Sequence, residues 1–151
     1  MIHPRKVLSG AMLASVLALG LTGCGQSVEM TLSDGESLQW EELRGEWVFV
    51  NYWAEWCKPC YEEIPELNAL DQHPGITVLG VNFDGETGES LRRVMRDMDI
   101  RFRVLEENPA EQFGWSQPLA LPATMVINPD GDLVEARFGE QTEEELKQLT
   151  E

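Results

Sequence analysis

The stretch from Trp47 to Leu70 constrains the fold of this chain more than any other part of the sequence. Its first seven residues, WVFVNYW, are almost entirely apolar, as in a strand that is buried on both faces. The segment Cys57–Cys60 (CKPC) follows three residues later and opens a run of apolar residues at helical spacing, in which Pro59 suits the first turn. The sequence therefore predicts a buried strand, a turn, and a helix that begins at two cysteines.

These two cysteines are placed for disulfide exchange. The thiolate is the nucleophile in that reaction, and the unpaired N–H groups and dipole at a helix N-terminus stabilise its charge. Cys57 would occupy this end of the helix, and Cys60, one turn later, is close enough to resolve a mixed disulfide. A purely structural disulfide explains the pair less well, because closing so short a loop removes little chain entropy.

Metal binding is the other chemistry that a pair of cysteines allows. A structural zinc site needs four protein ligands, and the chain after residue 24 adds only His73 to the two cysteines as a ligand of the usual zinc-finger type. Thiolates also suit copper(I), so copper binding stays open as an alternative. We predict no metal site and no cofactor.

Residues 1–23 are predicted to be a signal peptide. Arg5 and Lys6 form a basic start, and residues 7–21 carry no charge. Residues 21–24, LTGC, resemble the cleavage box of bacterial lipoproteins, in which a diacylglycerol is attached to the cysteine, here Cys24. If Cys24 is lipidated, one cysteine pair remains in the exported protein. The lipid would anchor the protein in the bilayer, with its domain on the periplasmic or extracytoplasmic side of the envelope, where disulfides persist. An ordinary secretory signal with an incidental cysteine is the alternative.

The rest of the chain is strongly acidic. After residue 23 it has 9 basic against 27 acidic residues, a net charge of −18, since Arg5 and Lys6 belong to the signal segment. This charge excludes nucleic acid as a partner, because binding phosphates needs basic patches. It also disfavours adhesion to anionic lipid, so the anchor itself would hold the protein at the membrane. We assign residues 24–30 to the lipidated cysteine and a short tether, and residues 31–151 to one domain.

The domain alternates between strands and helices. The hairpin turn at residues 129–132 (PDGD) and the Thr142–Glu145 capping box are typical turn and helix-start signals. The order gives an α/β fold with a mixed central sheet flanked by helices. Predicted strands are residues 48–53, 76–83, 102–105, 124–128 and 133–138, and predicted helices are residues 59–70, 91–98, 108–115 and one from 143.

Several motifs in this order resemble the thioredoxin superfamily, and within it the membrane-tethered TlpA-like disulfide reductases of bacteria. Residues 50–60 look like the active-site strand and turn, and Pro65 looks like the proline that interrupts the following helix. Residues 121–124 (LPAT) look like the cis-proline loop, and residues 128–131 like the hairpin turn. The similarity extends from about residue 34 to residue 149.

This resemblance implies a thioredoxin fold and thiol–disulfide oxidoreductase activity. Cys57 would be the attacking thiolate and Cys60 the resolving thiol. The support residues implied are Trp56 on the flank of the disulfide, Lys58 and Pro59 between the cysteines, and Leu121 with cis Pro122 beside them.

One position departs from thioredoxin. Asn51 stands where thioredoxin has a buried aspartate that handles the proton of the resolving cysteine. The TlpA-like branch often has an acid after the next strand instead, which makes Asp84 and Glu86 the candidates, with Glu86 favoured. The only effect that we predict for Glu63 is that its negative charge disfavours the Cys57 thiolate.

The resemblance also indicates partners. The clients would be proteins with disulfides, with the haem-binding cysteines of cytochrome c as the leading candidate, and a membrane-embedded electron donor would restore the dithiol. An oxidase or isomerase would use the same groups in the opposite direction. Thioredoxin-like copper chaperones usually have more widely spaced cysteines and an added histidine, so they are the weaker alternative.

Overall fold

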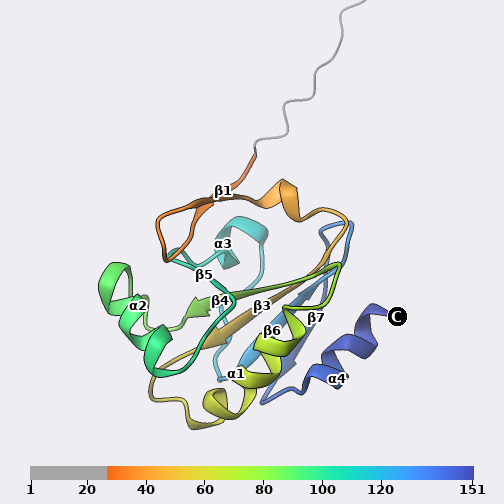
Figure 1. The fold of residues 1–151 in the computed structure, drawn as a ribbon. Helices are drawn as coiled ribbons and strands as arrows, with labels where there is room; N and C mark the ends of the chain where they lie inside the picture. The colour runs from red at the N-terminus through yellow and green to blue at the C-terminus, as the bar shows by residue number, and fades with distance from the viewer. Residues whose placement is uncertain (1–26) are drawn as a thin grey trace, which may run out of the picture.

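The computed structural model describes residues 27–151, so the predicted signal peptide and Cys24 lie outside the described residues. A five-stranded sheet with the order β5–β4–β3–β6–β7 forms its centre (Figure 1). β4 and β5 run parallel to β3, whereas β6 runs antiparallel to β3, so the sheet is mixed as predicted. The strands are β3 (Trp47–Trp53), β4 (Ile76–Asn82), β5 (Arg103–Leu105), β6 (Ala123–Ile127) and β7 (Leu133–Phe138).

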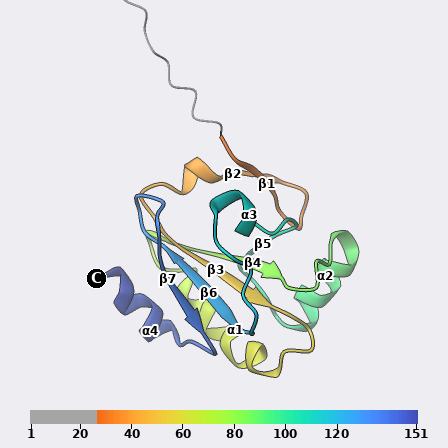
Figure 2. The same cartoon turned by 180° about the vertical axis from the view of Figure 1, so that it is seen from behind.

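Each face of the sheet is covered by a different set of elements (Figures 1 and 2). Alternate residues of β3 point to opposite faces, so Phe49 and Trp53 enter one core, whereas Val50 and Tyr52 enter the other. The first core is closed by α1 (Lys58–Leu70), α2 (Gly88–Asp97) and α4 (Glu143–Lys147), which is followed by the short turn η2 (Gln148–Thr150). The second is closed by β1 (Glu29–Thr31), β2 (Ser37–Gln39), η1 (Trp40–Leu43) and α3 (Ala110–Phe113).

The small N-terminal sheet is the main feature that the sequence did not predict. β1 and β2 form an antiparallel hairpin, and Met30, which we had placed in the tether, is buried in the second core. Strands of three residues are too short to show a clear hydrophobic period. The first strand therefore begins at Glu29, within the segment that we had assigned to the tether.

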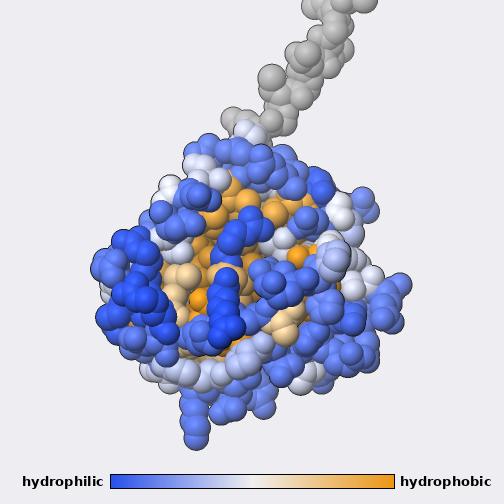
Figure 3. Space-filling view, in the orientation of Figure 1, coloured by the Kyte–Doolittle hydropathy of each residue, from blue (hydrophilic) through white to orange (hydrophobic). Residues whose placement is uncertain are grey.

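The other predicted elements are found within a few residues of their expected ends. α1 begins at Lys58 and continues through Pro65, and β7 has the predicted bounds. The capping box of α4 is also present: the Thr142 hydroxyl accepts from the Glu145 N–H, and the Glu145 carboxylate accepts from the Thr142 N–H. Figure 3 shows hydrophilic residues around a central area where apolar side chains are visible between the elements.

Gly80 in β4 lies where a side chain has no room. A Cβ at this position would be 2.8 Å from Trp53 Nε1 and 2.9 Å from atoms of both Phe102 and Val104. We expect Gly80→Ala to lower the free energy of unfolding by about 1–3 kcal/mol, because overpacking forces neighbouring side chains out of place. Urea denaturation measures this loss, and an unchanged midpoint would mean that the neighbours move aside freely.

Candidate active site

The two cysteines lie at the start of α1 and form a disulfide. Cys57 is the N-cap residue of α1 with an extended backbone, and the Cys60 N–H donates to the Cys57 carbonyl at 3.1 Å. The Cα atoms of the pair are 5.4 Å apart. Cys57 is 4% exposed and Cys60 1% exposed, so both are nearly covered and Cys57 is the more accessible. The predicted placement at a helix N-terminus is confirmed.

Trp56 forms the exposed flank of this turn. It is 64% exposed, and its Nε1 donates to both carboxylate oxygens of Asp84, at 2.9 and 3.2 Å. Its ring also stands edge-on against Phe83. One of the two acids that the sequence offered as a proton acceptor therefore positions the tryptophan. Glu86 is half-buried, and its backbone N–H donates to the Asn82 side chain.

The proline loop lies beside the cysteine turn. The Leu121–Pro122 peptide bond is cis, as the resemblance implied. β6 begins directly afterwards with Ala123, which pairs with Tyr52 near the end of β3, so Pro122 is placed close to the residues that lead into Cys57. Leu121 packs against the core cluster that contains both cysteines.

Glu63 is the site residue whose part the sequence analysis missed. It follows Cys60 by three positions on α1, so the two side chains are neighbours on one helix face. Glu63 is only 1% exposed. Burial raises the pKa of its carboxyl group from the usual 4.5 to about 7, although the hydrogen bonds from Asn51 and Gln141 act in the opposite direction and the charge of Glu140 adds to the rise.

A buried polar network surrounds this carboxyl group. The Asn51 side-chain amide donates to Glu63 Oε2 at 3.0 Å and to the Thr124 hydroxyl at 3.0 Å. The Gln141 backbone N–H donates to Glu63 Oε1 at 3.2 Å. The side-chain oxygen of Asn51, Oδ1, is buried with no hydrogen-bond partner among the described residues. The residue that replaces thioredoxin's aspartate therefore contacts an acid from the neighbouring helix.

This geometry combines a disulfide at a helix N-terminus, a cis-proline loop and a buried acid. Residues 25–136 match the AhpC/TSA family model. The chain belongs to this family. Thiol-disulfide oxidoreductase ResA of Bacillus cereus is 32% identical over 117 residues, 76% of this chain and 67% of that protein. ResA of Geobacillus thermodenitrificans is 30% identical over 128 residues, 82% of this chain and 73% of that protein.

Solved structures share the fold. A thioredoxin-family thiol:disulfide interchange protein from Chlorobium tepidum superposes with a TM-score of 0.70 at 23% identity, covering 82% of this chain and 90% of that one. StoA from Bacillus subtilis superposes with a TM-score of 0.66 at 20% identity, covering 82% of this chain and 96% of that one. This member of the AhpC/TSA family is thus a thiol–disulfide oxidoreductase with a thioredoxin fold.

Side chains of both charges lie around the cysteine turn of this protein. Lys58, between the cysteines, is exposed, whereas Glu55 forms an ion pair with Arg93 at 3.3 Å. The carboxylate of Glu55 is therefore partly compensated, and Lys58 is the cation that lies next to Cys57 in the sequence. Within residues 27–151, no cluster of three or more His, Cys, Asp or Glu side chains is arranged to hold a metal ion.

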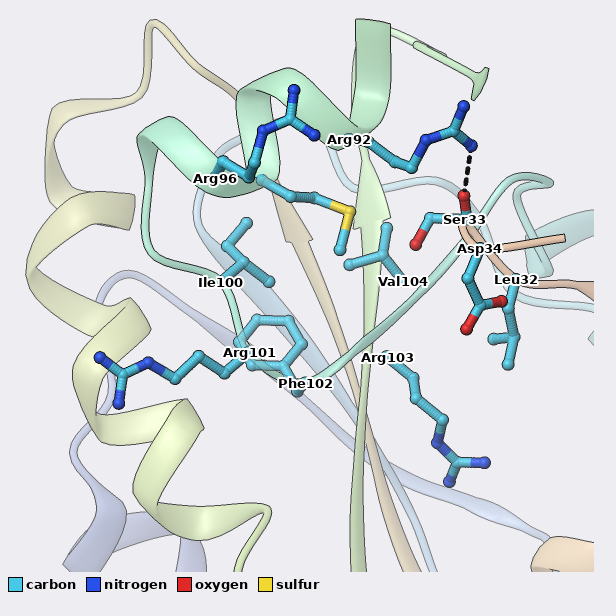
Figure 4. A pocket seen from close by; sticks show the side chains of 11 residues that line it. Leu32, Ser33, Asp34, Arg92, Arg96, Ile100, Arg101, Phe102, Arg103 and Val104 are labelled. Carbon is cyan, nitrogen blue, oxygen red and sulfur yellow. Dashed lines mark hydrogen bonds between the residues drawn. The ribbon is translucent and has the colours of Figure 1, made fainter. Parts of the chain in front are cut away.

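A cavity of about 340 Å³ lies at the β5 edge of the sheet, between α2, β5 and the N-terminal hairpin (Figure 4). Four arginines border it, yet Arg101 and Arg103 point away from its interior. Arg92 donates to the Ser33 carbonyl at 2.7 Å, and Arg96 pairs with Glu89. These arginines therefore do not converge on a ligand site, and the cysteines lie elsewhere.

Proposed function

We propose that this oxidoreductase reduces disulfides in exported client proteins through Cys57 and Cys60. The observation that carries the proposal is the position of Cys57, at a helix N-terminus beside the cis-proline loop. In the reduced protein the Cys57 thiolate attacks one sulfur of a client disulfide, and the other client sulfur leaves as a thiolate. The Cys60 thiolate then attacks the Cys57 sulfur, releases the second client thiolate and leaves the Cys57–Cys60 disulfide. Two electrons pass to the client.

Glu63 is our candidate for the proton acceptor of Cys60. The Cys60 thiol has to lose its proton before it can attack, and it is shielded from water. A carboxyl group with a pKa of about 7, one helical turn away, accepts a proton near neutral pH. Glu86, the acid that the sequence analysis favoured, is the alternative acceptor. Trp56, Pro59, Leu121 and Pro122 would shape the surface on which the client docks.

The cellular setting is part of the proposal. The lipoprotein-like box at Cys24 supports an acylated anchor in the bacterial envelope, with the domain on the periplasmic or extracytoplasmic side. No helix within residues 27–151 is long and apolar enough to span a membrane. A membrane-embedded donor would re-reduce the pair. Cytochrome c cysteines are the client class that the resemblance to TlpA-like reductases favours.

The reduction potential of Cys57–Cys60 tests the direction of the reaction. We expect a value near about −270 mV, similar to thioredoxin, when the purified protein is equilibrated with thiol redox buffers. Such a value requires a dedicated electron donor. A value near about −120 mV would instead identify an oxidant, and the proposed reduction of client proteins would then be wrong.

A further inference from the structure

The segment between β7 and α4, residues 139–142, is fixed at both ends. Gly139, with a φ of 84°, turns the chain at the end of β7, and its N–H donates to the Pro122 carbonyl of the cis-proline loop at 2.9 Å. At the other end the Glu143 N–H, at the start of α4, donates to Glu66 Oε2 on α1 at 2.9 Å. The segment therefore runs from the cis-proline loop to α1, beside which α4 lies (Figure 1).

Gln141, within this segment, has a side chain that binds the segment itself. The residue is 8% exposed. Its Nε2 donates to the Gly139 carbonyl at 3.1 Å and to the Glu140 carbonyl at 3.0 Å, and its Oε1 accepts from Arg137 Nε at 2.8 Å. Burying an amide group is costly unless such bonds are made, and here both ends of the amide have partners. The side chain therefore holds the backbone of this segment in one arrangement.

One of these bonds acts on the peptide group that contacts Glu63. The Glu140 carbonyl and the Gln141 N–H belong to the same planar trans peptide unit, in which the C=O and the N–H point in opposite directions. Gln141 Nε2 binds the carbonyl, and the N–H donates to Glu63 Oε1 at 3.2 Å. Because the unit is rigid, holding its carbonyl also sets the direction of the N–H that binds the carboxyl group.

The charged groups that face this carboxyl group are negative. Four glutamates line a cleft of about 340 Å³ between α1 and the segment: Glu62, Glu63, Glu66 and Glu140. β3 and β6 contribute the uncharged Asn51 and Thr124, and Arg137 is bound to Gln141. Burial raises the pKa of Glu63 to about 7, against the hydrogen bonds from Asn51 and from the Gln141 N–H. These two hydrogen bonds therefore favour the ionised carboxylate in this site.

We propose that Gln141 is a positioning residue for the proton transfer from Cys60. Its side chain orients the Glu140–Gln141 peptide so that the N–H stabilises the ionised carboxylate of Glu63. This is the form that takes the proton of the Cys60 thiol, which leaves a thiolate and a neutral carboxyl group. The proposal rests on the role proposed above for Glu63. Without the oriented N–H, a larger share of Glu63 is protonated at neutral pH and cannot accept this proton.

The pKa of Glu63 tests the orientation directly. The chemical shift of its carboxyl carbon, followed against pH by NMR in the purified oxidised protein and assigned with Glu63→Gln, reports this pKa. We expect Gln141→Ala to raise it by about one pH unit, because the ionised form loses a hydrogen bond while the anchors at Gly139 and Glu143 keep the segment in place. Gln148→Ala, at an exposed glutamine, is the matched control and should leave it unchanged. A pKa in Gln141→Ala that is unchanged, or lowered because water reaches the carboxyl group, overturns the proposal.

Gln141→Met separates the hydrogen bonds of this side chain from its packing. Methionine is similar in length to glutamine but has no N–H to donate to the two carbonyls. We therefore expect Gln141→Met to raise the pKa of Glu63 as much as Gln141→Ala does. Circular dichroism checks that both variants are folded. If the methionine variant keeps the wild-type pKa, the alanine result comes from lost packing and the proposal is wrong.

The pH dependence of disulfide reduction distinguishes this inference from the function on which it rests. If Glu63 accepts the Cys60 proton, Gln141→Ala moves the inflection of the rate profile upward by the same amount as the pKa. The rate at about pH 7 then falls about fivefold, because the ionised share of Glu63 drops from about one half to about one tenth. A raised pKa with an unchanged rate profile would reject Glu63 as the acceptor and leave the orientation of the N–H by Gln141 intact. The pKa is measured in the oxidised protein, so it does not depend on the direction of electron transfer.

Discussion

Replacing Cys57 by serine should lower the rate of insulin-disulfide reduction by a factor on the order of 10³ or more, because the serine hydroxyl cannot supply the attacking thiolate. Replacing Cys60 should have a different result. The Cys57 thiolate can still attack a client disulfide, but nothing displaces the client afterwards. We therefore expect Cys60→Ser to stop at a mixed disulfide, which non-reducing electrophoresis and intact mass measurement detect as a covalent adduct.

The contrast between the two variants is the decisive part of this experiment. Both cysteines are almost completely covered and both belong to the same core cluster, so loss of packing should be similar in the two variants. A difference in adduct formation then reports their chemical order. An adduct that accumulates with Cys57→Ser and not with Cys60→Ser would reverse the assignment of attacking and resolving thiols.

Much of this site could be predicted because its signals are local. The apolar run of β3, the cysteines at the helix start and the turn at Gly131 are each visible within a few residues of sequence. The cis-proline loop was a different case, because Leu121 and Pro122 approach the cysteines only through the pairing of β6 with β3. The resemblance to TlpA-like reductases identified it, and local patterns alone would not have done so.

Glu63 was missed for a physical reason. Its sequence neighbourhood is rich in glutamates, and counting charges near Cys57 treats all of them alike. The helical period separates them, since Cys60, Ile64 and Leu67 share the buried face on which Glu63 lies, whereas Glu62 is exposed. Its partners Asn51 and Gln141 are 12 and 78 residues away, so the network exists only in the folded chain.

Titration of Glu63 should make the stability of the oxidised protein depend on pH. The folded protein holds this proton with a pKa of about 7, against 4.5 for the ordinary carboxyl group. Between these values the folded state binds more protons than the unfolded chain, so the free energy of unfolding falls as pH rises. The full loss is about 3 kcal/mol and is complete above about pH 7. Below about pH 4.5 both states are protonated and the effect is absent.

Glu63→Gln should remove this component, because glutamine stays neutral at every pH; its single amide oxygen can accept from either the Asn51 amide or the Gln141 N–H, and loss of the other bond lowers stability equally at all pH values. Urea denaturation between about pH 4 and pH 8 measures the difference between wild type and variant, in which the other titrating groups cancel. As pH rises, we expect the free energy of unfolding of Glu63→Gln to increase relative to that of wild type. Glu62→Gln, at the exposed neighbouring residue, should show the same pH dependence as wild type.

The same substitution separates the structural role of Glu63 from its proposed role in proton transfer. If the carboxyl group accepts the Cys60 proton, Glu63→Gln should reduce disulfides more slowly than wild type. Its pH–rate profile should also lack the inflection at about pH 7. A stability difference with an unchanged rate profile would leave Glu63 as a buried acid that titrates without serving the cysteines. Glu86 would then be the remaining candidate, and Glu86→Gln would have to produce the change in the rate profile.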